Sequence, residues 1–201
     1  MNDRLRWLRN SLKAQDIQGM IVSNPVNVHY LTNIDAEGIL LLTRKENIYI
    51  TDDRYVESVQ KTLMIDDEII VSNRKNLQLE DYENFFMFCE NVGLEEYYVT
   101  YARYKEIMRM YKIHSLVETE GMIEKQRQIK DSEEIGYIKK ACEITDDCFT
   151  YLLKYIKKGM LERQIADEIE RYFKANNAVP AFDTIVASRR KFFYATCSSR
   201  K

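Results

Sequence analysis

Short apolar runs alternate with amphipathic segments up to about residue 118 of the sequence. A first helix is predicted by apolar side chains at helical spacing, at Leu5, Leu8, Leu12 and Ile17. Further helices are expected through Tyr55, Val59 and Leu63, and over residues 79–91 and 104–110. Strand-like runs are expected at residues 20–23, 38–43, 48–51, 69–71, 97–99 and 115–117. The pattern therefore alternates between the two kinds of element.

The runs at 38–43 and 48–51 flank a polar turn and predict a β-hairpin. Asp52 and Asp53 follow it and are interpreted as caps of the next helix, because a carboxylate accepts the free amide hydrogens at a helix start. Strands separated by helices predict an α/β fold, and the hairpin makes its sheet mixed rather than purely parallel. We therefore expect a mixed sheet flanked by helices.

The pattern changes after Gly121. Asp131 and Glu134 have the spacing of a capping box and open a long helix that runs to about Gly159. A second helix is expected over 161–176, and a strand over 184–187. We place a domain boundary near residues 119–128, which separates a domain at 1–120 from an incomplete one at 128–188.

Charge and composition exclude several classes of protein. The 30 basic and 32 acidic side chains are interspersed and form no basic stripe, which argues against nucleic-acid binding. No apolar run approaches the roughly 20 residues that span a bilayer, and no nucleotide-binding glycine motif occurs. The four cysteines form no CxxC pair and indicate reduced thiols in a cytoplasmic protein.

No set of residues with a catalytic pattern emerges. Asp146 and Asp147 are adjacent on a helix, so their side chains point about 100° apart and cannot share one metal ion. His29 is expected in a surface turn after Asn24-Pro25, and His114 precedes a strand without clustered acids. Cys197 has no base partner for nucleophilic chemistry. We assign no catalytic residue and no metal ligand, and leave substrate-binding residues unknown.

Four stretches, in order, resemble the creatinase, prolidase and aminopeptidase P family. They are Met20–Ile34 (MIVSNPVNVHYLTNI), Ile48–Tyr55 (IYITDDRY), Arg127–Phe149 (RQIKDSEEIGYIKKACEITDDCF) and Gly159–Ser188 (GMLERQIADEIERYFKANNAVPAFDTIVAS). Three positions depart from the family pattern. Asn33 and Asn177 stand where glycine is usual, and Leu161 replaces the usual threonine, with loss of a helix cap.

The resemblance implies a creatinase/prolidase-type N-terminal domain, followed by the start of an α+β "pita-bread" catalytic domain with two helices and one strand. In the family, that domain binds two divalent metal ions (Mn, Co or Zn), held by two Asp, one His and two Glu, and cleaves peptide bonds that precede proline. The ligands come from strands after the segment that Ser188 ends, so we expect this chain to be inactive. The substrate pocket would lie near Phe182 and Ile185.

The resemblance also implies proline-containing peptides as substrates of the full-length parent, and a homo-oligomer formed through the N-terminal domain. Two alternatives stay open. The chain could be a non-catalytic α/β oligomerisation module, or a fragment of a creatinase-like amidinohydrolase, since one scaffold hosts both kinds of chemistry.

Residues 189–201 do not continue the family pattern. One permitted codon spelling of Arg189 to Cys197, read one base later, gives Gly-Glu-Asn-Ser-Ser-Met-Pro-His-Ala, which resembles the family's continuation. We therefore predict that a single-base frameshift after Ser188 produced an out-of-frame tail at 189–201.

Overall fold

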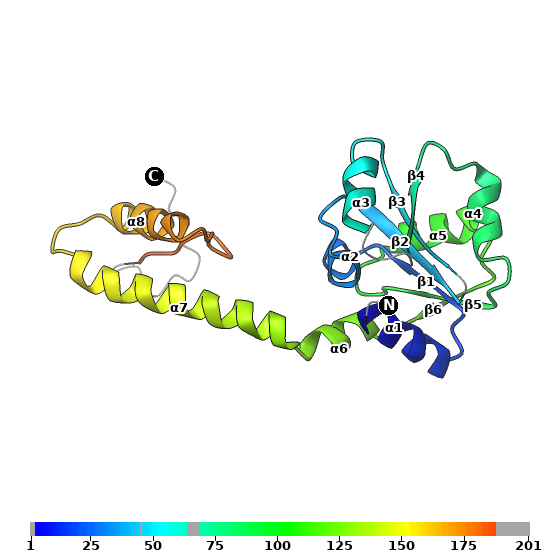
Figure 1. The fold of residues 1–201 in the computed structure, drawn as a ribbon, viewed down its shortest axis with the longest axis horizontal. Coiled ribbons are helices and arrows are strands. Elements are labelled where there is room, and N and C mark those ends of the chain that lie inside the picture. Colours follow the sequence, from blue (N-terminus) through cyan, green and yellow to red (C-terminus); the bar gives the residue numbers. More distant parts are fainter. Residues whose placement is uncertain (1–2, 45, 64–68, 188–201) are drawn as a thin grey trace. The chain divides into compact units, whose positions relative to one another are not determined.

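The computed structural model describes residues 3–44, 46–63 and 69–187, and the chain divides into two units, Met1–Ile129 and Lys130–Lys201 (Figure 1). Unit 1 contains a six-stranded sheet in the order β4-β3-β2-β1-β5-β6. The strands are β1 (Gly19–Val22), β2 (Gly38–Thr43), β3 (Asn47–Thr51), β4 (Ile69–Asn73), β5 (Asn91–Leu94) and β6 (Ser115–Glu118).

Strand β2 is antiparallel to both of its neighbours, and the remaining pairs are parallel. The predicted hairpin is confirmed, with Leu40 opposite Tyr49. Five strands therefore point in one direction, and their carboxyl ends lie at the same edge of the sheet. This mixed sheet confirms the predicted α/β fold class.

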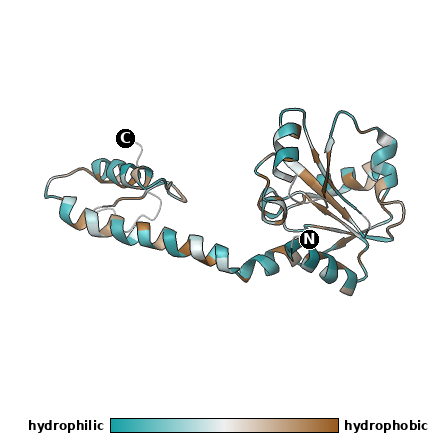
Figure 2. Ribbon diagram, in the orientation of Figure 1, coloured by the Kyte–Doolittle hydropathy of each residue, from teal (hydrophilic) through white to brown (hydrophobic). Residues whose placement is uncertain are grey.

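Helices cover both faces of the sheet in unit 1. They are α1 (Asp3–Ala14), α2 (Pro25–Thr32), α3 (Val56–Leu63), α4 (Leu79–Phe85), α5 (Tyr101–Met110) and α6 (Met122–Gln128). Side chains alternate between faces: Leu40 and Leu42 pack in a cluster with α1, α2 and α6, whereas Leu41 packs in a second cluster with Ile107. Figure 2 shows the hydrophobic residues along the central strands. The result is two apolar layers, one on each face.

The expected turn at Asn24-Pro25 is instead the start of helix α2. The Asn24 side chain accepts a hydrogen bond from the amide of Val26, Pro25 occupies the first turn, and Asn33 ends the helix in the left-handed region at φ 56°. Asparagine tolerates this conformation, so it can stand where the family has glycine. The expectation that His29 lies in a turn was wrong, because His29 is on this helix.

The strand predicted at 97–99 was also wrong, since those residues form a turn and β5 is Asn91–Leu94. Gly93 weakens the strand pattern but is required there, because a Cβ atom would lie 2.7 Å from Cγ2 of Thr119. The helix predicted over 79–91 ends at Phe85, and Phe88 is 79% exposed beyond it. Aromatic content alone therefore misplaced both elements.

In unit 2, the residues that the structure describes form the helices α7 (Ser132–Tyr155) and α8 (Glu162–Ala175). The predicted cap of α7 is confirmed: the Asp131 carboxylate accepts from the Glu134 amide, and the Glu134 carboxylate accepts from the Asp131 amide. Leu161 precedes α8 without a side-chain cap. The strand predicted at 184–187 is not formed, because within the described part of unit 2 those residues have no strand to pair with.

The boundary between the units lies between Ile129 and Lys130. The segment 119–128, expected to join two domains, is largely helix α6, whose Met122 and Ile123 are buried in the core of unit 1. The segment 189–201, predicted to be an out-of-frame tail, lies outside the described residues.

Candidate functional site at the carboxyl edge of the sheet

Polar side chains gather where the five parallel-running strands of unit 1 end. Ser23 and Asn24 follow β1, Asp52 and Asp53 follow β3, and Glu95 follows β5. In open α/β sheets, ligands bind outside the carboxyl ends of the strands, so this edge is the candidate site of unit 1. Two separate polar networks occupy it.

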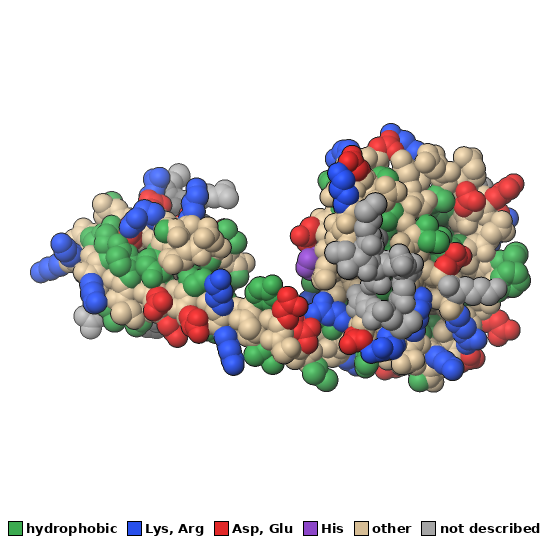
Figure 3. Space-filling view, viewed as in Figure 1, with side chains coloured by type: hydrophobic (Ala, Val, Ile, Leu, Met, Phe, Trp, Pro, Cys, Tyr) green, Lys and Arg blue, Asp and Glu red, His purple; other side chains and the backbone are tan. Residues whose placement is uncertain are grey.

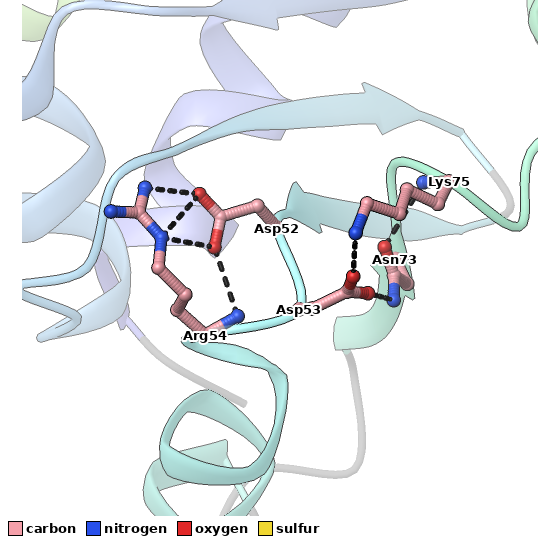
Figure 4. Close-up of polar contacts among 5 residues, drawn as sticks. All are labelled: Asp52, Asp53, Arg54, Asn73 and Lys75. Atoms are coloured by element: carbon pink, nitrogen blue, oxygen red, sulfur yellow. Dashed lines mark hydrogen bonds and ion pairs between the residues drawn. The ribbon is translucent and has the colours of Figure 1, made fainter.

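The first network begins with a pair formed by Asp52 and Arg54 (Figure 4). Oδ1 of Asp52 accepts a 3.0 Å hydrogen bond from the Arg54 amide, and Oδ2 lies 2.5 Å from Nη2 of Arg54. The guanidinium also lies 5.0 Å from the ring centroid of Tyr55. Hydrogen bonds from the Arg54 side chain lower the pKa of Asp52. Asp52 is therefore ionised and held in one orientation.

The neighbouring acid, Asp53, points toward the adjacent strand. Its carboxylate accepts hydrogen bonds from the side chains of Asn73, the last residue of β4, and Lys75, which follows that strand. The parallel register places Thr51 beside Asn73 and so brings these residues together. The hydrogen bond from Lys75, followed by that from Asn73, lowers the pKa of Asp53.

The expectation that Asp52 and Asp53 cap helix α3 was therefore wrong. The helix begins at Val56, whereas the two carboxylates bond to Arg54, Asn73 and Lys75. In the sequence, two adjacent acids before a helix fit a helix cap as well as they fit a polar cluster with a neighbouring strand. Only the register of β3 on β4 distinguishes the two arrangements. This cluster is exposed, so its ion pairs contribute little to stability.

The second network is centred on Glu95, which is only 4% exposed. Its Oε2 accepts from the amides of Ser23 and Asn24 at 2.6 and 2.8 Å, and its Oε1 accepts from Nδ2 of Asn27 at 2.8 Å. Burial raises the pKa of Glu95, against the opposing effect of these hydrogen bonds. The network thus joins the end of β5 to the start of helix α2.

Asn27 extends this network to helix α6. Its Nδ2 donates to Oε1 of Glu124 at 2.6 Å, and its Oδ1 accepts from Nη1 of Arg127 at 3.0 Å. Glu96 adds a second connection, because its carboxylate accepts from the amides of Thr119 and Gly121 at 3.0 and 2.8 Å. This network was not predicted from the sequence. Its available signal was a run of acids directly after an apolar strand.

A third polar cluster lies in unit 2, between α7 and α8. The Glu168 carboxylate lies 2.5 Å from the Tyr151 hydroxyl, 2.5 Å from Nη2 of Arg171 and 2.9 Å from Nε of Arg171. These contacts lower the pKa of Glu168 to about 2, with the Arg171 hydrogen bonds as the largest cause. The cluster fixes one helix to the other, since Tyr151 comes from α7.

The other residues considered from the sequence are dispersed. Nδ1 of His29 lies 2.8 Å from the Asp35 carboxylate on an exposed surface. His114, Asp146, Asp147, Phe182 and Ile185 are exposed. Cys197 lies outside the described residues. Over 3–44, 46–63 and 69–187, no three His, Cys, Asp or Glu side chains converge as a metal site would require. None of the helices described is both long and apolar enough to span a bilayer.

Comparison with known proteins identifies both parts of the chain. Residues 4–129 match the Creatinase/Prolidase N-terminal domain, and residues 136–197 match metallopeptidase family M24. The second match includes residues 189–197, which belong to the segment predicted to be out of frame. The two matches occur in the order that the resemblance implied.

Individual relatives agree with these matches. "Uncharacterized peptidase YqhT" of Bacillus subtilis is 32% identical over 92% of this chain and 53% of its own length. The Xaa-Pro dipeptidase of Pyrococcus horikoshii is 26% identical over 94% of this chain and 52% of its own length. The chain therefore spans about half the length of these relatives.

Solved structures show the same fold. The Xaa-Pro dipeptidase from Bacillus anthracis superposes with a TM-score of 0.75 at 26% identity, over 87% of this chain and 49% of that one. The prolidase from Pyrococcus furiosus superposes with a TM-score of 0.76 at 27% identity, over 91% of this chain and 56% of that one. The chain therefore belongs to the creatinase/prolidase family, with a creatinase/prolidase N-terminal domain followed by a metallopeptidase family M24 segment.

Proposed function

We propose that this chain corresponds to the front half of an Xaa-Pro peptidase, whose full-length form hydrolyses peptide bonds that precede proline. The observation that carries the proposal is the ordered pair of family matches, 4–129 and 136–197, shared with a relative named as an Xaa-Pro dipeptidase. Unit 1 then supplies the non-catalytic domain, and α7 and α8 open the catalytic one.

The two divalent metal ions of the full-length parent, expected to be Mn, Co or Zn, do not fit the residues described. Such a site needs several acids and a histidine around ions roughly 3.5–4 Å apart. The described part of the chain brings no three potential ligands together. Several of its acids are instead paired with cations, as Asp52 is with Arg54, and Glu95 is bonded to backbone amides and Asn27. We therefore derive no step of catalysis through these ions.

The proposal predicts that the chain alone has no peptidase activity. Purified protein, incubated with an Xaa-Pro dipeptide or a longer peptide with proline second, should release no product above a heat-denatured control, with or without Mn, Co or Zn. Metal-dependent release of proline would overturn the predicted inactivity. Hydrolysis of a guanidino substrate such as creatine would instead favour the amidinohydrolase alternative.

Self-association through unit 1 belongs to the same proposal. Several large apolar side chains of unit 1 are exposed, among them Phe88 at 79% and Tyr97 at 82%. Side chains of this kind are enriched at protein interfaces. Light scattering after gel filtration should give the mass of an oligomer, and Phe88→Ser should reduce it. A strictly monomeric chain would contradict this part.

A cytoplasmic location stays a prediction from the sequence.

The frameshift after Ser188 also stays a prediction, and the gene decides it. Resequencing should find an Arg189 codon that ends in GG, with the reading frame one base later encoding further acids and a histidine. A shifted frame that closes at once would mean that residues 189–201 are native.

A further inference from the structure

A cavity of about 320 Å³ lies at the other edge of the sheet, where β1 begins and β2 ends. Helix α1 forms one wall through Arg9 and Lys13, and Arg44 borders it from the end of β2. Leu12, Ile17 and Leu42 supply its apolar lining and are at most 5% exposed. This volume lies within the range of small-molecule sites, roughly 300–1,000 Å³.

Arg9 carries a buried hydrogen-bond donor without an acceptor. Its Nε atom is inaccessible to solvent and has no hydrogen-bond partner among the described residues. A buried polar group of this kind costs free energy unless an acceptor satisfies it. Arg9 also lines the cavity, so the positive charge of its guanidinium acts on any anion bound there.

The charges around the cavity are mainly positive. No acid is among the described residues that line the cavity. Asp16 pairs with one of its cations: Oδ1 lies 3.7 Å from Nη2 of Arg44 and also accepts from Nε2 of Gln18 at 2.9 Å. Asp16 therefore partly neutralises Arg44, whereas Arg9 and Lys13 add further positive charge to the lining. Figure 3 shows basic side chains around α1. A surplus of positive charge beside an apolar lining suits an anion with an apolar part.

We propose that this cavity binds a small organic anion. Its carboxylate or phosphate group would lie among Arg9, Lys13 and Arg44, and its apolar part would contact Leu12, Ile17 and Leu42. The guanidinium of Arg9 suits either oxyanion, because its donors match the geometry of both. The site is at the opposite edge of the sheet from the polar networks described above and does not depend on the peptidase proposal.

Titration of the whole chain with two probes tests the proposal. Inorganic phosphate and a short aliphatic carboxylate such as butyrate are added at low ionic strength, while NMR follows the Nε–H signal of Arg9. A saturable shift with either probe is expected, and the probe that binds more tightly identifies the oxyanion. Arg9→Gln and Lys13→Gln should each weaken binding about tenfold, as for loss of a charge-assisted hydrogen bond.

Arg6→Gln provides the matched control. It removes the same charge from the same helix, but Arg6 is paired with Asp3 at the surface, 2.5 Å away. Binding should be within about twofold of the original in this variant, because Arg6 is not among the residues that line the cavity and its charge is already paired with Asp3. The proposal is overturned if neither probe gives a saturable shift, or if Arg6→Gln weakens binding as much as Lys13→Gln does. Lys13 is exposed, so its variant tests the site even where Arg9→Gln disturbs folding.

Discussion

The two units bury their amphipathic helices to different extents. In α1 the apolar stripe of Leu5, Leu8 and Leu12 is at most 5% exposed, because the sheet of unit 1 covers it. In α7 the corresponding positions Ile135 and Phe149 are 43% and 63% exposed. Figure 3 shows such hydrophobic side chains at the surface of unit 2. An apolar stripe predicts a helix, but the stripe stabilises the fold only as far as another element covers it.

The part that polar contacts play also differs between the two units. Unit 1 adds a buried carboxylate, Glu95, to an already complete apolar core. Unit 2 relies on Glu168, Tyr151 and Arg171 to join helices whose buried apolar side chains are few, among them Leu152 and Ala166. Unit 1 should therefore be sensitive to loss of apolar volume, and unit 2 to loss of specific polar contacts.

The largest expected difference comes from truncating one leucine in each unit. Leu40→Ala removes a fully buried side chain from the centre of the sheet and should lower the free energy of unfolding by about 2–5 kcal/mol. Leu153→Ala on α7, where the side chain is 67% exposed, should change it by less than about 0.5 kcal/mol. Urea unfolding followed by circular dichroism measures both values. Equal losses would show that the stripe of α7 is covered.

The pKa values of the two buried acids, Glu95 and Glu168, are shifted in opposite directions. The pKa of Glu95 is raised, so the folded chain retains a proton that the unfolded chain has lost, and this group's contribution to stability falls as pH rises through its folded pKa. The pKa of Glu168 is lowered from 4.5 to about 2, so its contribution is present above 4.5 and is lost as pH falls toward 2.

Carboxyl carbon NMR of the whole chain between pH 2 and pH 8 checks this difference. Glu95→Gln and Glu168→Gln assign the two signals by their disappearance. The midpoint of Glu168 should lie near 2, and that of Glu95 above the ordinary glutamate value of 4.5. Coincident midpoints would mean that the two environments do not differ as described.

Much of the fold could be predicted from the sequence because local signals and tertiary partners agreed. The runs around Leu40 and Ile50 and the Asp131–Glu134 box each had a strong local pattern, and each formed as expected. Helix α2 was missed because Asn24-Pro25 suits a turn and a helix start equally well. Strand β5 was missed because Gly93, which the close approach of Thr119 requires, interrupts its apolar pattern.

The polar networks were much harder to predict than the fold. Asp53 meets Lys75 only because β3 and β4 pair in parallel with Thr51 beside Asn73. Glu95 meets Asn27 only because β1 and β5 are neighbours, although the two residues are 68 positions apart. Strand order and register determine both contacts, and a single sequence gives neither directly.

The smallest expected effect concerns the starts of the two helices in unit 2. Asp131 caps α7 through its side chain, whereas Leu161 precedes α8 and only donates its amide, to Oε1 of Gln164 at 2.9 Å. Leu161→Thr should supply the missing hydroxyl acceptor and raise the free energy of unfolding by about 1 kcal/mol. Leu161 is 66% exposed, so the shorter side chain loses little packing.

Leu161→Val is the matched control, because valine has the shape of threonine without the hydroxyl. In urea unfolding, the threonine variant should be more stable than the valine variant, and Asp131→Ala should be destabilised by a similar amount of about 1 kcal/mol. Helix α8 buries few apolar side chains of its own, so a cap should influence whether its first turn forms. If the threonine and valine variants unfold at the same urea concentration, the absent cap does not limit α8, and the Glu168 cluster alone determines how well unit 2 holds together.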